Sequence, residues 1–366
     1  MPSQQRPCLR SLGFSVGLLP PGTLNAITDV PGVLVGHSTI IEGEGKLVPG
    51  KGPIRTGVTL ILPHSENIYR QKVPASSFVL NGYGKTIGLV QIEELGYLES
   101  IIALTNTLNV PLVANALIDY HLETNPDIGI STSSINVVVA ECNDGYLNDI
   151  QGRHVKKAHV FEAIKNASQI VTEGAVGAGT GMSAFGFKGG IGTASRIVST
   201  HEDQFILGIL VLTNFGRKKD LLFLGHRFLE LLSPPVTDDN FNAPAGSIIV
   251  VLATNAPLTS RQLKRLAKRI PLGIARTGGM AAHYSGDIII AFSTANKLLH
   301  DSDETFKTLT IVRDSSKLFG ELLQATVEAT EEAILNSLLK AQTIVGRDGH
   351  QRTALPLNVL QQLKEK

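Results

Sequence analysis

The sequence predicts an α/β fold in which layered β-sheets lie between helices. Short β-branched runs alternate with segments of helical periodicity along the chain. The expected strands 204–213, 247–254 and 287–293 are apolar on both faces, so both faces of their sheet must be covered. Because long helices flank this succession of buried strands, layers fit better than a barrel with regular strand–helix alternation.

Local patterns predict the individual elements. Apolar runs bounded by turn residues predict strands at 56–62, 135–140, 204–213, 247–254, 287–293 and 306–312. Helical periodicity predicts helices at 90–105, 113–123, 157–171, 220–232, 260–270 and 315–341. The most regular is the last, whose apolar stripe is Phe319, Leu323, Val327, Ile334 and Leu338. The proline-bearing segment 233–246 predicts a loop that leads directly into the strand at 247.

Composition and charge exclude several classes of protein. The 366 residues carry 33 basic and 32 acidic side chains, which argues against a basic nucleic-acid-binding surface and against an acidic tail. The length allows two domains of about 150 residues or one large one. No apolar run is long enough to span a membrane, and no signal peptide is evident. We therefore expect no membrane partner. The two cysteines, Cys8 and Cys142, are expected to be reduced, so we expect a cytoplasmic protein.

Several features have the spacing of functional motifs without their context. Gly13-Phe14-Ser15-Val16-Gly17 matches a nucleophile elbow, but two prolines follow and no strand-to-helix turn is expected. Gly84-Lys85-Thr86 ends like a phosphate-binding loop, but Val79 stands where the first glycine is required. The ten histidines show no metal-binding spacing, so we expect no metal and no cofactor. The glycine-rich segment 174–196 leaves two interpretations open: backbone packed against an active centre, or a structural loop.

The junction Gly246-Ser247 is the most informative place in the chain. A proline-bearing loop ends in glycine, and a hydroxyl follows on the first residue of a buried strand. Attack of this hydroxyl on the preceding carbonyl, then hydrolysis, would free Ser247 as a new N-terminus whose α-amine is a nearby base. Glycine tolerates a strained backbone and leaves the carbonyl uncrowded. A plain strand start is the alternative that the junction alone leaves open.

Polar residues at other strand ends could complete such a site. Asn214 ends the strand before the junction and could donate to an oxyanion. Ser285 and Asp287 begin the strand after it and offer a hydroxyl and a carboxylate. The segment after strand 135–140 offers further carboxylates, Glu141 and Asp144, and the phenol of Tyr146. Taken singly, these groups also match ordinary turn signals.

Together and in this order, the motifs resemble a known family, the self-processing serine aminopeptidases. These are the L-aminopeptidase/D-esterase and the β-peptidyl aminopeptidases of peptidase family S58. The resemblance covers roughly residues 20–350 and rests on these stretches: 25–33 with 35–37, 80–82, 104–107, 143–149, the glycine segment 174–196, 213–216, 245–247, 285–287 and 291–296.

The resemblance implies a fold and an assembly. The fold would be a four-layer αββα sandwich, like the N-terminal-nucleophile hydrolases but with different connectivity. The chain 1–366 would form a single catalytic domain that cuts itself into an α fragment, 1–246, and a β fragment, 247–366. The αβ pairs would remain associated and form a homo-oligomer, usually a tetramer.

The resemblance also implies roles for the candidate residues. Ser247 would be the nucleophile that forms an acyl-enzyme, and Asn214 an oxyanion donor. Ser285 and Asp287 would assist Ser247, and Tyr146 would line the pocket and share in oxyanion stabilisation. Glu141 and Asp144 are both candidates for the carboxylate that binds the substrate ammonium. The substrates would be short peptides, amino-acid amides or esters that lose their N-terminal residue.

Two other functions compete with this one. An acyltransferase of the ornithine-acetyltransferase sort would use the same chemistry, but those enzymes are expected to carry threonine where this chain has Ser247. A non-enzymatic protein that binds a ligand through the glycine-rich segment is the other, although the segment lacks a dinucleotide fingerprint.

Overall fold

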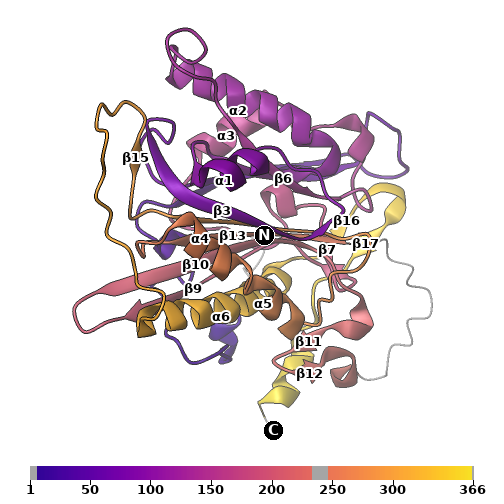
Figure 1. Ribbon diagram of the computed structural model, residues 1–366. Coiled ribbons are helices and arrows are strands. Elements are labelled where there is room, and N and C mark those ends of the chain that lie inside the picture. Colours follow the sequence, from indigo (N-terminus) through magenta and orange to yellow (C-terminus); the bar gives the residue numbers. More distant parts are fainter. Residues whose placement is uncertain (1–5, 233–245, 365–366) are drawn as a thin grey trace.

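The computed structural model describes residues 6–232 and 246–364 and places them in four layers, helix–sheet–sheet–helix (Figure 1). The predicted loop at 233–246 lies, apart from Gly246, outside the described residues. The smaller sheet has the strand order β1-β2-β5-β6, and the larger one the order β15-β3-β14-β13-β10-β9, with β4 paired to β3. None of the helices in the described ranges is long and apolar enough to cross a membrane.

The strands and helices have the following bounds. The smaller sheet contains β1 Leu34–Glu42, β2 Ile54–Leu62, β5 Ile102–Asn106 and β6 Val138–Cys142. The larger contains β3 Gln71–Gly82, β4 Tyr97–Leu98, β9 Ile191–Ser199, β10 Gln204–Asn214, β13 Ser247–Thr254, β14 Gly286–Ser293 and β15 Leu298–Leu299. Three small hairpins are β7 Ser183–Ala184 with β8 Phe187–Lys188, β11 Leu222–Phe223 with β12 His226–Arg227, and β16 Ile344–Val345 with β17 Gln351–Arg352. The α-helices are α1 Leu89–Leu95, α2 Val110–Thr124, α3 Lys157–Lys165, α4 Ser260–Ala267, α5 Ile270–Arg276 and α6 Lys317–Lys340.

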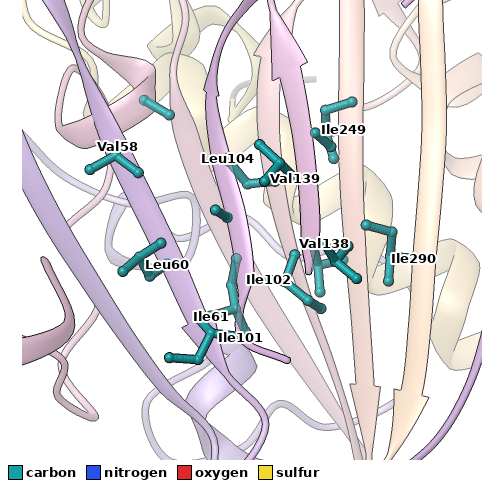
Figure 2. Close-up of a cluster of buried hydrophobic side chains, with 14 of the residues drawn as sticks. Val58, Leu60, Ile61, Ile101, Ile102, Leu104, Val138, Val139, Ile249 and Ile290 are labelled. Carbon is teal, nitrogen blue, oxygen red and sulfur yellow. The ribbon is translucent and has the colours of Figure 1, made fainter. Parts of the chain in front are cut away.

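The strand β13 explains why the central strands are apolar on both faces. Successive side chains of a strand point to opposite sides of the sheet. Ile249 packs in the core that includes the smaller sheet, whereas Ile248 packs in the core that includes α4, α5 and α6. Figure 2 shows Ile249 of β13 close to Val139 and Ile290 of β14 close to Val138, and both valines belong to β6 of the smaller sheet. The prediction that both faces are covered is therefore confirmed.

Some expected elements are wrong. The segment 90–105 is not one helix, because α1 ends at Gly96, which has a left-handed φ of 70°, and the later apolar residues form the buried strand β5. The segment 220–232 is not one long helix but the hairpin β11–β12 followed by a 3-10 helix, Phe228–Leu231, since Leu224 and Gly225 both have positive φ. Residues 306–312 form no strand, and Phe306 is 90% exposed.

Three long strands, β1, β3 and β9, were not expected from the sequence. Each contains small or polar residues that interrupt the apolar run, such as Ser76 and Ser77 in β3. These side chains are buried and hydrogen-bonded; the Ser77 hydroxyl donates to Glu93 at 2.9 Å. Tertiary partners therefore compensate for the weak local pattern.

Candidate active site

The register of the larger sheet brings three predicted segments to one edge. The strand β10 runs antiparallel to β13, so its last residue, Asn214, lies opposite the first residue of β13, Ser247. The strand β14 runs parallel to β13, and its first residue, Gly286, lies on the other side of Ser247. Neighbouring strands are about 4.8 Å apart, so the side chains at this edge are within reach of one another.

Ser247 is 6% exposed, and its hydroxyl oxygen accepts a hydrogen bond from the Gly286 N–H at 3.2 Å. The preceding residue must be glycine, because a Cβ at Gly246 would lie 2.0 Å from the carbonyl oxygen of Asn214. The φ of Gly246 is not in the left-handed region. Close approach of the β10 backbone, rather than a strained φ, is thus what requires glycine before the serine.

Two side chains around the start of β14, those of Ser285 and Asp287, form a hydrogen-bonded pair. Ser285 Oγ donates to Asp287 Oδ1 at 2.6 Å, and both side chains are buried. The other carboxylate oxygen, Oδ2, has no hydrogen-bond partner among residues 6–232 and 246–364. Burial raises the pKa of Asp287 to about 6, although the Ser285 hydroxyl and the Ile248 N–H partly offset this. A buried carboxylate with an unpartnered oxygen is suited to hold a proton or to receive a cation.

The side-chain amide of Asn214 is held in one orientation. Its Oδ1 accepts from the Ser183 N–H at 2.9 Å, so its NH₂ end is directed the other way, where it donates to the Asn143 carbonyl at 2.9 Å. An amide nitrogen carries two hydrogens, so the second can serve an oxyanion beside Ser247. Ser183 belongs to the glycine-rich segment, so the backbone of this segment contacts the candidate site through Asn214.

A cavity of about 590 Å³ opens at this edge of the sheet. Its lining includes five of the predicted residues: Gly246, Ser247, Asn214, Tyr146 and Glu141. Ser285 and Asp287 lie behind the lining, next to Gly286. The ring of Tyr146 stacks on His350, with centroids 4.6 Å apart, and the Arg352 guanidinium lies 3.5 Å from the Tyr146 ring centroid in a cation–π contact.

The two candidate carboxylates differ in position. The side chain of Glu141 lines the cavity. Its carboxylate accepts hydrogen bonds from the Lys85 N–H at 2.8 Å and from the Thr107 hydroxyl. Burial raises its pKa, and the Lys85 charge opposes that shift. Asp144 is fully buried, accepts from Thr56 at 2.6 Å and is not part of the cavity lining. Burial raises the pKa of Asp144 to about 7. The structure thus separates two residues that the sequence left equivalent.

Other residues of the cavity were not assigned a role from the sequence: Tyr83, Lys85, Thr107, Ser183, Tyr284, Arg347 and Arg352. Thr107 and Ser183 lie inside stretches that carried the family resemblance, so that signal could have found them. The two arginines lie in and beside the hairpin β16–β17, for which no sequence motif was available.

The model of peptidase family S58 matches residues 25–352. The chain belongs to peptidase family S58. This S58 peptidase is 42% identical over 350 residues to the β-peptidyl aminopeptidase BapA of Sphingosinicella microcystinivorans, covering 92% of this chain and 86% of that protein. Family membership selects a peptidase over the acyltransferase and ligand-binding alternatives.

Solved structures resemble this S58 peptidase over nearly their whole length. The PH0078 protein of Pyrococcus horikoshii OT3 has a TM-score of 0.92 at 54% identity, covering 98% of this chain and 99% of that one. The L-aminopeptidase D-Ala-esterase/amidase of Ochrobactrum anthropi has a TM-score of 0.89 at 36% identity, covering 99% of each chain. That structure is described as a new variant among the Ntn hydrolase folds, so the predicted fold class is confirmed.

Proposed function

We propose that Ser247 is the nucleophile of this self-processing serine aminopeptidase, and that it is released by cleavage of the Gly246–Ser247 bond. The observation that carries the proposal is the strand register that sets Ser247 between Asn214 and Gly286 at the wall of the cavity. A nucleophile, an oxyanion donor and a buried carboxylate then meet at one sheet edge, as acyl transfer requires.

Self-cleavage begins when Ser247 Oγ attacks the carbonyl carbon of Gly246. The C–O bond forms, the peptide C–N bond breaks, and the hydroxyl proton passes to the departing nitrogen, which gives an ester. Water then hydrolyses the ester, leaving fragment 1–246 with a terminal carboxylate and fragment 247–366 with a free α-amine on Ser247. The glycine at 246 leaves its carbonyl accessible because no Cβ is present there.

Turnover uses the α-amine that cleavage creates. A free α-amine has a pKa of about 7.7–8.0, so part of it is neutral near pH 7 and accepts the Ser247 hydroxyl proton. The hydroxyl oxygen attacks the substrate carbonyl, the Asn214 amide donates to the oxyanion, and the amine or alcohol leaves with the proton. Water then releases the acyl group. The buried pair Ser285–Asp287 lies next to Gly286. The ionised carboxylate of Asp287 then faces the ammonium that forms on Ser247 and stabilises it.

Glu141 is the proposed site for the substrate ammonium. Its carboxylate faces the cavity, whereas that of Asp144 is buried among Thr56 and Asn148. Two relatives are named β-peptidyl aminopeptidases, and a third is an L-aminopeptidase D-Ala-esterase/amidase. We therefore propose N-terminal residues of short peptides, amides or esters as the acyl part of the substrate.

The proposed assembly is one catalytic domain, 1–366, whose αβ pairs form a homo-oligomer, with a tetramer as the expected state. The two fragments would stay together because β10 and β3 of the first hydrogen-bond to β13 and β14 of the second. Exposed apolar side chains such as Val90 and Ile130 favour further association, which native mass spectrometry can measure. We propose a cytoplasmic location, consistent with two unpaired cysteines.

The variant Ser247→Ala tests the proposal most directly. It should remain one chain of 39.1 kDa by intact mass and lose activity on aminoacyl p-nitroanilides by about 10⁴-fold or more. The wild type should give two fragments. Ser293→Ala, a buried serine at the far end of β14, is the matched control and should keep both cleavage and turnover. A Ser247→Ala chain that still splits, or an active wild type that stays uncut, contradicts the proposal.

A further inference from the structure

Two cavity residues, Arg347 and Arg352, have no part in the proposed reaction. Both come from the hairpin β16–β17 and the turn between its strands. Arg347 Nε donates to the Gly145 carbonyl at 2.7 Å, and one of its terminal nitrogens pairs with Asp348 at 3.0 Å. Arg352 lies against the Tyr146 ring. Contacts with backbone and ring hold both guanidinium groups at the cavity wall.

Hydrogen bonds place Arg352 on the β10 side of the nucleophile. Arg352 Nε donates to Ser183 Oγ at 3.0 Å. The backbone N–H of the same serine donates to Asn214 Oδ1, and Asn214 lies opposite Ser247 in the sheet register. Ser183 therefore links Arg352 to Asn214, the proposed oxyanion donor.

Glu141 lies on the opposite, β14 side. Gly84 is the link, because a Cβ there would lie 3.4 Å from the Cα of Gly286 and 3.6 Å from Oε1 of Glu141. Gly286 is the partner of Ser247 on β14. The anionic and cationic ends of the cavity thus flank the nucleophile across about two strand spacings, or roughly 10 Å.

The charges of the lining follow the same division. Among residues 6–232 and 246–364, the charged residues of the lining are Lys85, Glu141, Arg347 and Arg352. Lys85 lies on the Glu141 side, with its Nζ 4.9 Å from the Tyr83 ring centroid. Two positive side chains, Arg347 and Arg352, therefore lie on the other side, where Asp348 pairs with Arg347.

We infer that Arg347 and Arg352 form a subsite for a carboxylate on the leaving residue of the substrate. This inference rests on the proposed function, which sets the ammonium at Glu141 and the scissile carbonyl at Ser247. The leaving residue then points to the arginine side, where guanidinium groups bind carboxylates through two parallel hydrogen bonds. An extended peptide of two or three residues spans about 7–10 Å, which is comparable to two strand spacings. Short peptides with a charge at each end are the preferred substrates.

The test compares leaving residues that carry a carboxylate at the C-terminus, on the side chain or not at all. With X the N-terminal residue that wild-type enzyme releases fastest from p-nitroanilides, kcat/KM is measured for X-Gly, X-Gly-amide and X-Asp-amide. We expect X-Gly to exceed X-Gly-amide by about tenfold or more, since a lost charge-assisted hydrogen bond has at least this effect. An equal gain with X-Asp-amide would assign the subsite to any carboxylate of the leaving residue, and a gain with X-Gly alone to the terminal one.

Variants then locate the effect. In Arg347→Gln and Arg352→Gln the ratio of X-Gly to X-Gly-amide should fall toward one, and a general loss of activity cancels because the ratio is taken within one variant. Lys85→Met is the matched control, since it removes a lining cation on the other side and should keep the ratio. If Arg352→Gln does not fold, Arg347→Gln and the wild-type ratio still decide.

The outcomes separate the two proposals. A wild type that hydrolyses X-p-nitroanilide but shows equal kcat/KM for X-Gly, X-Gly-amide and X-Asp-amide overturns the carboxylate subsite and leaves the nucleophile assignment intact. A ratio that survives in both arginine variants also overturns it. A wild type that hydrolyses none of these compounds and stays uncut overturns the proposed function itself.

Discussion

Two buried charged clusters of this molecule are satisfied to very different degrees. The Arg196 cluster consists of Arg10, Arg196, Glu328 and Glu332, and the Asp287 cluster of Ser247, Ser285 and Asp287. Arg196 is fully buried and pairs with Glu332 at 2.7 Å and with Glu328 at 3.2 Å. Asp287 has no such cation among the described residues, and one of its oxygens has no partner there. The first cluster is complete, whereas the second has no positive charge within the part of the chain that the structure describes.

The difference separates a structural role from a chemical one. The carboxylates of the Arg196 cluster also bind the N-terminal segment, since Glu332 pairs with Arg10 at 2.8 Å and Glu328 accepts from the Leu18 N–H at 3.0 Å. These ion pairs and hydrogen bonds connect β9, α6 and the N-terminal segment. An incomplete cluster costs stability and persists where a reaction uses it. The proposed α-amine of Ser247 is the cation that the Asp287 cluster lacks.

The largest stability effect should come from breaking the complete cluster. Arg196→Met leaves Glu328 and Glu332 buried with less compensation, so the free energy of unfolding should fall by about 3–5 kcal/mol. Urea denaturation measures this change. Arg261→Met is the control, because its ion pair with Asp314 is exposed and should contribute about 1 kcal/mol or less. Equal effects of the two substitutions would remove the distinction between the clusters.

Next in size is a kinetic effect beside the incomplete cluster. Asn214→Ala removes the proposed oxyanion donor and should lower kcat by about 10²–10³-fold. Stability should change by only about 1–2 kcal/mol, since two hydrogen bonds are lost. Steady-state kinetics with a p-nitroanilide measures the effect, and Asn296→Ala is the control because its side-chain hydrogen bond, to the Thr310 carbonyl, is exposed. Unchanged kcat in Asn214→Ala would exclude this residue from the reaction.

The smallest effect has the opposite sign from that of Arg196→Met. In a Ser247→Ala chain, which should remain uncut, Asp287→Asn should raise the free energy of unfolding at pH 7 by about 1–3 kcal/mol. Burial raises the folded pKa of Asp287 from 3.8 to about 6, so between these values the folded state keeps a proton that the unfolded state has lost. Stability therefore falls as pH rises through this window, and asparagine removes that loss.

Denaturation at two pH values checks this sign. The gain from Asp287→Asn should be present at pH 7 and should vanish below about pH 4, where both states are protonated. A destabilised Asp287→Asn chain at pH 7 would mean that the carboxylate already has a stabilising partner, and the contrast between the clusters would then fail.

Much of the fold was predictable because its signals are local. The strand at 247–254 was predicted with its observed bounds, and the helix at 315–341 differs from α6 by a few residues. Both have strong patterns, one apolar on two faces and one with a helical stripe. The segment 90–105 was not predictable in this way, because its apolar residues fit a helix and a strand equally until β2 and β6 are there to pair with β5.

The residues of the candidate site were likewise predictable only in part from the sequence. The order of motifs along the chain was enough to indicate the family and to single out Ser247, Asn214, Ser285 and Asp287 as candidates. Only the tertiary structure separated Glu141 from Asp144, and only it placed Arg347 and Arg352 at the cavity. The physical reason is that local sequence determines the direction and periodicity of an element, whereas the exposure and neighbours of a side chain depend on strands and loops distant in the chain.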